Sequence, residues 1–195
     1  MKVSDWAKVT QSCSLAAGRW SKVVENRGNT QSLAPHKNML HRTFMMDMSW
    51  VTGRIAVGGG IWTAENMIQA ARAGVTHIID MQIEFDDTPL AVPHGIRVLW
   101  NPIDDDFQPK SPDVFQRGVD FALEALDEQG TKLFVHCAAG VHRAPMMTLA
   151  ILCSLGWKVA DALQLIEARR PVVDFADVYV NSVKRFLHEQ VRATK

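Results

Sequence analysis

The spacing of apolar positions changes along the chain, and these changes predict strands that alternate with helices. Four short apolar runs are typical of buried strands: 54–57, 75–81, 96–100 and 132–136. Between and after them apolar residues recur at helical spacing, which predicts five helices: 63–72, 111–130, 144–155, 160–169 and 178–191. This order favours an α/β fold, with a central, mostly parallel sheet flanked by helices.

Local signals support several of these boundaries. Thr63 can cap the first helix, and Gly74 follows its end. Ser111 begins another helix because it is followed by proline and aspartate, residues that favour the first turn. Residues 58–60 are three consecutive glycines. Their spacing differs from that of a nucleotide-binding loop, so we interpret them as a flexible turn.

The N-terminal part of the chain differs from the rest. Residues 3–26 carry apolar positions at helical spacing and predict one or two helices. Residues 26–40 are rich in Gly, Asn, Ser and Pro, which is typical of a linker or loop. We therefore divide the chain into a helical extension with its linker over 1–45 and a folded domain over 46–195.

Composition narrows the class of protein. Of the 195 residues, 47% are hydrophobic and 22% charged, as in ordinary globular domains. The 21 Lys and Arg equal the 21 Asp and Glu, so no global basic field would attract nucleic acid or an anionic membrane. The chain lacks a spanning apolar stretch and a signal-peptide core, which predicts a cytoplasmic location. Its three widely spaced cysteines argue against a disulfide framework.

The stretch 136–143, His-Cys-Ala-Ala-Gly-Val-His-Arg, carries the clearest chemistry. An apolar run leads into Cys137, five residues separate it from Arg143, and a Pro-containing apolar segment follows as a helix. A strand, a tight loop and a helix N-terminus together present backbone N–H groups and a partial positive charge. A thiol in such surroundings loses its proton more readily, and the guanidinium matches two oxygens of a phosphoryl group.

This pattern, with His136 before the cysteine and Gly140 inside the loop, resembles the signature of the cysteine-dependent phosphatases, most closely the dual-specificity type. The resemblance covers about 48–190. It implies a protein tyrosine phosphatase-like fold, with Cys137 as nucleophile and Arg143 as phosphate ligand. It also implies that His136 either helps to set the thiol pKa or is a structural hydrogen bonder behind the loop. The backbone N–H groups expected to bind phosphate belong to Ala138, Ala139, Gly140, Val141, His142 and Arg143.

Thiolate attack expels an alkoxide or phenoxide, which needs a proton at neutral pH. Three consecutive acids, residues 104–106, follow the strand over 96–100. Matched to the family, Asp105 is the expected general acid and Asp106 the second choice, with Asp104 least favoured. The alternative interpretation is a solvated turn.

Two positions depart from the family pattern. Ala144 stands where the family usually has Ser or Thr, so we expect slower hydrolysis of the cysteinyl-phosphate and a higher pKa for Cys137. His142 stands where small or polar residues are common; its ring either faces the substrate phosphate or lies at the loop rim.

These features predict a metal-independent phosphomonoester hydrolase, in the first place a protein tyrosine or dual-specificity phosphatase. The alternatives are a phosphatase of phosphoglucans, phosphoinositides or RNA 5′ ends, and a weakly active phospho-binding module. No cofactor is expected, because Arg143 and the loop amides replace a metal. His136, Cys137 and His142 form no convincing metal site, since neighbouring strand residues point to opposite faces. The expected partner is a phosphorylated protein or another phosphomonoester, without nucleic acid or membrane; the oligomeric state stays open.

Overall fold

The structure is a computed structural model that describes residues 46–193. The helices expected within 3–26 and the linker expected over 26–40 lie outside these residues. Within the described range, no helix combines the length and apolarity that a membrane crossing requires.

The centre of the fold is a five-stranded sheet in the order β1-β2-β5-β3-β4. Its strands are β1 (Met48–Trp50), β2 (Ile55–Gly58), β3 (His77–Asp80), β4 (Arg97–Trp100) and β5 (Leu133–His136). Only the edge pair β1–β2 is antiparallel, while β2, β5, β3 and β4 run parallel. The expected mostly parallel sheet is therefore confirmed, and the carboxyl ends of β5 and its neighbours meet at one edge.

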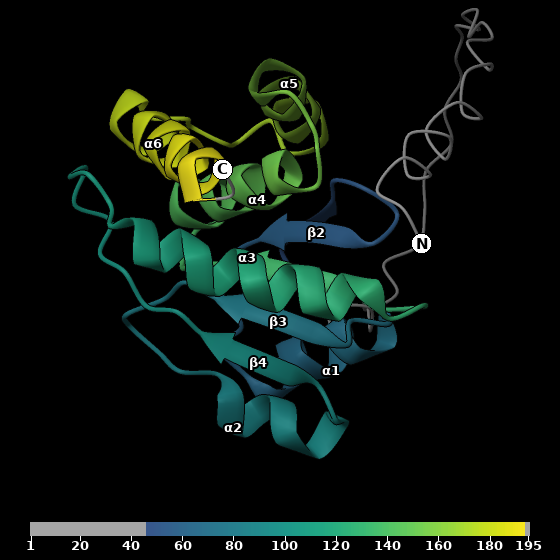
Figure 1. Cartoon of the computed structure of the whole chain (residues 1–195). Coiled ribbons are helices and arrows are strands. Elements are labelled where there is room, and N and C mark those ends of the chain that lie inside the picture. Colours follow the sequence, from purple (N-terminus) through teal and green to yellow (C-terminus); the bar gives the residue numbers. More distant parts are fainter. Residues whose placement is uncertain (1–45, 194–195) are drawn as a thin grey trace, which may run out of the picture. The chain divides into compact units, whose positions relative to one another are not determined.

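Helices cover both faces of this sheet (Figure 1). One face carries α3 (Pro112–Asp127), α4 (Arg143–Ser154), α5 (Val159–Arg169) and α6 (Asp177–Ala193), and the other carries α1 (Ala64–Arg72) and α2 (Thr88–Ala91). Alternate strand residues serve the two faces: Val135 belongs to the first core cluster and Phe134 to the second. This alternation follows from the period-two pleat of a strand.

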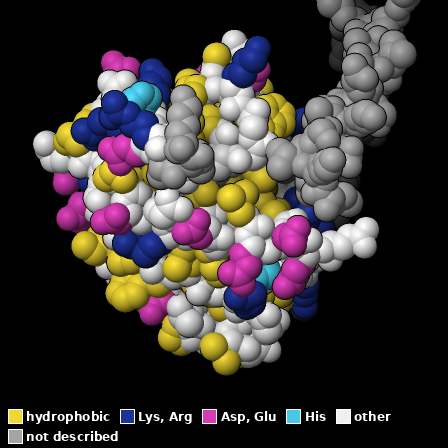
Figure 2. Space-filling model, viewed as in Figure 1, with side chains coloured by type: hydrophobic (Ala, Val, Ile, Leu, Met, Phe, Trp, Pro, Cys, Tyr) yellow, Lys and Arg dark blue, Asp and Glu magenta, His cyan; other side chains and the backbone are white. Residues whose placement is uncertain are grey.

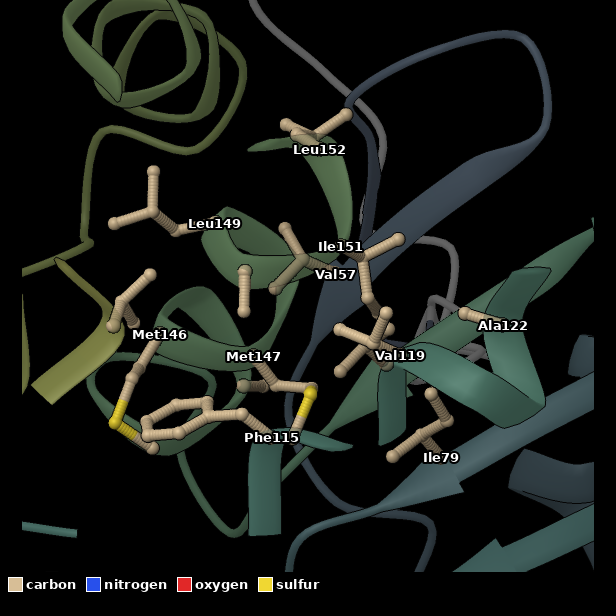
Figure 3. Packing of buried hydrophobic residues seen from close by; sticks show 14 of the residues in the cluster. Val57, Ile79, Phe115, Val119, Ala122, Met146, Met147, Leu149, Ile151 and Leu152 are labelled. Carbon is tan, nitrogen blue, oxygen red and sulfur yellow. The ribbon is translucent and has the colours of Figure 1, made fainter. Parts of the chain in front are cut away.

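Helix α4 is the centre of the larger core. Every residue from Arg143 to Leu152 is buried, as the apolar sequence of this segment predicts. In Figure 3, Met147 and Ile151 of α4 lie among residues of the sheet and α3, including Val57 and Val119. Because α4 is packed on all sides, the loop that precedes it has a rigid support.

The predicted strands and helices of the described part are all present, with small differences at their ends. Thr63 caps α1 by accepting a hydrogen bond from the Asn66 N–H, and Ser111 caps α3 through the Asp113 N–H. Strand β1 and the turn formed by α2 and η2 (Val92–His94) were not predicted. The first has only three residues and the second contains two prolines, so neither gives a periodic apolar signal.

Candidate active site

The loop between β5 and α4 holds the predicted nucleophile. Cys137 is buried, and its Sγ accepts a hydrogen bond from the Gly140 N–H at 3.3 Å. Gly140 has φ 65°, and a Cβ there would lie 2.4 Å from the carbonyl carbon of Gly58. This loop position therefore requires glycine for its backbone conformation and for the close approach of strand β2. The glycine triplet that begins with the last residue of β2 packs directly against the loop, since the Gly60 N–H donates to the Ala138 carbonyl.

Arg170 supports the loop from behind. Its Nε donates to the Gly140 carbonyl at 2.7 Å and its Nη2 to the Ala139 carbonyl at 3.1 Å, while Asp47 binds the outer edge of the guanidinium at 2.6 and 2.7 Å. In a trans peptide the C=O and N–H groups point in opposite directions. Holding these two carbonyls on the outside therefore turns the N–H groups of Gly140 and Val141 towards the inside of the loop.

Arg143 begins α4 and is 3% exposed. Glu84 binds it in a bidentate ion pair, with Nη1–Oε2 at 2.9 Å and Nη2–Oε1 at 2.8 Å. The hydrogen bond with Arg143 holds the pKa of Glu84 below its ordinary value. Burial works to lower the pKa of Arg143, but Glu84, Cys137 and Asp105 outweigh it, so that pKa is raised.

The remaining hydrogen-bonding capacity of Arg143 faces one side. Its Nη1 also donates to the Ile103 carbonyl at 3.1 Å, so both Nη1 hydrogens are used. The buried Nε–H has no hydrogen-bond partner within residues 46–193, and one Nη2 hydrogen is also left over. These two N–H groups form the side edge of the guanidinium, which can bind two oxygens of a phosphoryl group.

Asp105 lies beside that free edge, with its Oδ2 3.7 Å from the Arg143 Nε. Its Oδ1 accepts a hydrogen bond from the Tyr179 hydroxyl at 3.0 Å, and its Oδ2 lies 3.1 Å from the His142 Nδ1. His142 thus contacts this carboxylate at the loop rim, and its Nε2 lies 3.5 Å from an Asp174 carboxylate oxygen. The structure brings Cys137, Arg143, His142 and Asp105 together.

The other two acids of the triplet are placed differently. Asp106 forms an ion pair with Lys110, whose side chain is 8% exposed. This hydrogen bond, with a second from the Gln108 N–H, lowers the pKa of Asp106. Asp104 is exposed.

An aromatic group fixes the acid loop, which we define as residues 104–109. Tyr179, from the first turn of α6, is 1% exposed and accepts a hydrogen bond from the Phe107 N–H at 2.9 Å. Phe107 has φ 55°, a conformation that costs free energy for a residue other than glycine. Its ring stacks on Tyr179 at 5.7 Å and meets His142 edge-on at 5.0 Å. These contacts hold the strained loop in one conformation.

His136 lies on the other side of the sheet from the loop interior. Its Nε2 is 2.9 Å from the Asp87 Oδ2, its Nδ1 is 3.8 Å from the Asp80 Oδ1, and its ring stacks on Phe134. Burial raises the pKa of Asp80 to about 7, although the neighbouring His136 acts in the opposite direction. Cys137 belongs to the opposite core cluster from Phe134, so the imidazole and the thiol face different layers.

The described part of the chain contains one set of potential metal ligands, and it differs from the set considered in the sequence. Ligand atoms of Asp80, Asp87 and His136 lie within 4.8 Å of one another, and all three residues are buried. Within this set, the hydrogen bond from His136 to Asp87 orients the imidazole.

Comparison with known proteins identifies the class of this site. Residues 61–188 match the family described as "Dual specificity phosphatase, catalytic domain", and the chain belongs to this family. It is therefore a phosphatase of the dual-specificity type, within the cysteine-dependent protein tyrosine phosphatase superfamily, as its sequence predicts.

Individual relatives agree with this assignment. Dual specificity protein phosphatase 26 of Pongo abelii is 27% identical over 189 residues, covering 90% of this chain and 87% of that protein. Dual specificity protein phosphatase 5 of Rattus norvegicus is 35% identical over 75 residues, or 38% of this chain and 19% of that protein.

Solved structures share the fold. A crystal structure of PTPMT1 in complex with PI(5)P superimposes with a TM-score of 0.66 at 19% identity, covering 74% of this chain and 97% of that one. Human DUSP28 has a TM-score of 0.62 at 21% identity, covering 73% and 94%.

Several residues of the site were not predicted from the sequence. Glu84 binds the Arg143 guanidinium and Tyr179 binds the Asp105 carboxylate, while Asp47 pairs with Arg170 behind the loop. Arg170 belongs to the stretch 169–173, which, with the helix that follows it, resembles the closing segment of the family. The others join the loop from distant parts of the chain, and no local pattern marks them.

Proposed function

We propose that this phosphatase dephosphorylates proteins through a cysteinyl-phosphate on Cys137, with Asp105 as general acid. The observation that carries the proposal is the position of the Asp105 Oδ2, 3.7 Å from the Arg143 Nε, whose N–H has no hydrogen-bond partner within residues 46–193. A phosphoryl group held by that edge would have its leaving oxygen within reach of the carboxyl group.

In the first step the Cys137 thiolate attacks phosphorus. A sulfur–phosphorus bond forms, the bond to the ester oxygen breaks, and protonated Asp105 gives its proton to that oxygen. The Arg143 side edge and the inward N–H groups of the loop bind the three phosphoryl oxygens as charge moves onto them. The phosphate-binding set we propose is the backbone of Ala138, Ala139, Gly140, Val141, His142 and Arg143.

In the second step water attacks the cysteinyl-phosphate. The Asp105 carboxylate, now deprotonated, takes a proton from that water, and the sulfur leaves as a thiolate. The hydrogen bond from the Gly140 N–H to Sγ supports the leaving thiolate. Ala144 offers no hydroxyl for a further bond, which makes this step the expected bottleneck.

The contacts of the acid loop favour Asp105 over its neighbours as the acid. Asp106 forms its ion pair with Lys110. Asp105 instead has a hydrogen-bond donor on one oxygen and faces Arg143 with the other.

The surroundings of the loop favour a protein substrate. Exposed aromatic rings lie next to residues of the site: Trp62, 48% exposed, pairs with Phe85, the neighbour of Glu84 in the chain, and Phe107, 50% exposed, lies against His142. Aromatic rings suit the side chains of a peptide, and phosphotyrosine in particular. The loop supplies no Lys or Arg besides Arg143, which disfavours phosphoinositides and RNA 5′ ends.

The catalytic domain we propose spans 46–195, after an extension over 1–45. The nucleophile must stay a free thiol, and this requirement supports a reducing, cytoplasmic compartment.

The test is steady-state hydrolysis of para-nitrophenyl phosphate in EDTA, with and without vanadate. Wild-type turnover blocked by vanadate and absent from Cys137→Ser would support the thiolate mechanism, and Asp105→Asn should be slow where Asp106→Asn is not. Turnover by Cys137→Ser would refute the mechanism. Loss of wild-type turnover in EDTA would refute it as well. A panel of phosphotyrosine and phosphoserine peptides, phosphoinositides and phosphoglucan then decides the substrate class.

A further inference from the structure

The solvent face of α6 carries a basic groove, which we define by Pro109, Val178, Lys184, Arg185, His188 and Arg192. The hollow has a volume of about 720 Å³ and is open to solvent. Figure 2 shows Lys and Arg side chains with a His gathered over the position of α6.

The periodicity of α6 explains this stripe. Lys184, His188 and Arg192 follow one another at four-residue intervals, so they lie above one another on one side of the helix. Val183 and Phe186 are buried on the other side, against the core. The cationic groups therefore point outward because the apolar half of α6 is needed for packing.

The charges of the groove are not neutralised locally. Within residues 46–193, none of Lys184, Arg185, His188 and Arg192 forms an ion pair with a carboxylate, and Glu189 is the one acid among the groove's lining residues. The cations of the active site differ, because Arg143 pairs with Glu84 and Arg170 with Asp47. In a chain with formal net charge zero, this groove is a local positive surplus.

The groove shares a residue with the acid loop. Pro109 ends the acid loop, and Val178 precedes Tyr179, whose hydroxyl binds Asp105. From Val178 to Arg192 a helix rises roughly 21 Å, at about 1.5 Å per residue. An extended peptide of about six residues covers that length, at roughly 3.3 Å each.

We propose that the basic groove binds an acidic segment of the substrate protein next to the phosphorylated residue. This inference rests on the proposed protein phosphatase function and adds the substrate's sequence preference. Charge complementarity selects Asp, Glu or a second phosphoresidue. The apolar side chains of Pro109 and Val178, with the Asn181 amide, suit a peptide better than the uniformly charged backbone of RNA.

The test compares the double variant Lys184→Glu/Arg185→Glu with wild type on three substrates. These are para-nitrophenyl phosphate, a phosphotyrosine peptide with six acidic residues on one flank, and the same peptide with neutral flanks. Both orientations of the acidic flank are made. The matched control is Arg72→Glu/Lys158→Glu, which makes the same charge change at two exposed positions outside the groove.

We expect the groove variant to raise KM for one acidic-flank peptide on the order of tenfold, because each exposed ion pair contributes a few-fold. Its kcat/KM for para-nitrophenyl phosphate and for the neutral peptide should stay within about twofold of wild type, as should all values of the control. Added salt should reduce the wild-type preference for the acidic peptide. Equal losses on acidic and neutral peptides, or no loss on either, would overturn the proposal.

A binding measurement separates this inference from the proposed function. Fluorescence anisotropy of the labelled acidic phosphopeptide is measured on Cys137→Ser, with and without the groove substitutions. Weaker binding with the substitutions supports the groove even if wild type proves inactive on para-nitrophenyl phosphate, which would refute only the proposed chemistry. Unchanged peptide binding, with groove-dependent binding of RNA or of phosphatidylserine vesicles instead, would overturn the inference and assign the groove to another ligand.

Discussion

Tyr179→Phe removes a single oxygen atom and tests how Asp105, the proposed general acid, is held in place. The Tyr179 hydroxyl donates to the Asp105 Oδ1 at 3.0 Å and accepts from the Phe107 N–H at 2.9 Å. Burial, together with the Asp105 charge, raises the pKa of Tyr179 to about 12, so the hydroxyl keeps its proton near neutral pH. The phenylalanine ring can still stack on Phe107, and only the two hydrogen bonds are lost.

The size of the effect follows from those bonds. A hydrogen bond to a charged group contributes about 1.5–3 kcal/mol net, and each 1.36 kcal/mol in the barrier is about tenfold in rate. If the whole contribution positions Asp105 in the transition state, kcat falls roughly 10- to 100-fold. This loss does not exceed the rate enhancement of roughly 10²- to 10⁴-fold that general acid catalysis supplies.

The assay is a series of aryl phosphates with leaving groups from difluoromethylumbelliferone to phenol. A good leaving group departs without a proton, so Tyr179→Phe should slow phenyl phosphate strongly and the fluorogenic ester little. Asp105→Asn gives the largest rate loss that removal of the acid can cause. Adding Tyr179→Phe to this variant should cause no further loss of rate. Equal losses across the series, or additive losses in the double variant, would refute the reasoning. His142→Asn should show the same leaving-group dependence, with the exposed His94→Asn as its control.

Three further predictions concern other parts of the site. Asp80→Asn should flatten the pH dependence of stability. The pKa of Asp80 is about 7 in the folded protein against an ordinary 3.8, so the folded state binds this proton more tightly than the unfolded state does. Asp80 therefore contributes to stability at low pH, and this contribution is lost as the pH rises through 7. Urea unfolding at pH 5 and pH 8 should show the variant gaining on wild type as the pH rises, by at most about 3 kcal/mol, because about two pH units of this range lie below the pKa of about 7; equal differences at both pH values would contradict this. Arg170→Lys should lower stability by about 2 kcal/mol and kcat/KM more than tenfold, because an ammonium cannot hold both loop carbonyls and Asp47. Thermal unfolding would measure the loss of stability and vanadate affinity the change in the loop; unchanged vanadate binding would argue against the loop-support role. Ala144→Ser should raise steady-state turnover and reduce the burst amplitude in stopped-flow assays, and an unchanged burst would exclude hydrolysis of the cysteinyl-phosphate as the bottleneck.

The parts predicted from sequence are those with local causes. The apolar run before Cys137, the glycine in the loop and the apolar segment from Ala144 specify a strand, a tight loop and a buried helix within a short stretch of chain. The caps at Thr63 and Ser111 are equally local, because the hydroxyl bonds the N–H two or three residues ahead. Such features need no knowledge of the rest of the fold.

The parts that could not be predicted depend on tertiary contacts. Glu84 reaches Arg143 across 59 positions, Tyr179 reaches Asp105 across 74, and Asp47 reaches Arg170 across 123. A glutamate, a tyrosine and an aspartate in these segments look like many surface residues until the sheet order is known. The glycine triplet was likewise interpreted as a flexible turn, whereas a Cβ at Gly58 or Gly59 would collide with Asp47 and one at Gly60 with the Trp62 ring, so close packing requires glycine there.

The distribution of ion pairs separates phosphate chemistry from substrate attraction. At the loop, the carboxylates of Glu84 and Asp47 neutralise Arg143 and Arg170 and fix their orientation, which leaves N–H groups aimed at one point and little long-range field. Along α6, the cations of the basic groove form no ion pairs within the described residues and present a diffuse positive surface. From the two proposals we therefore expect a phosphate to be bound tightly only inside the loop and an acidic protein segment to be attracted from farther away. A chain without net charge can in this way combine a stringent catalytic loop with a separate surface for recognition.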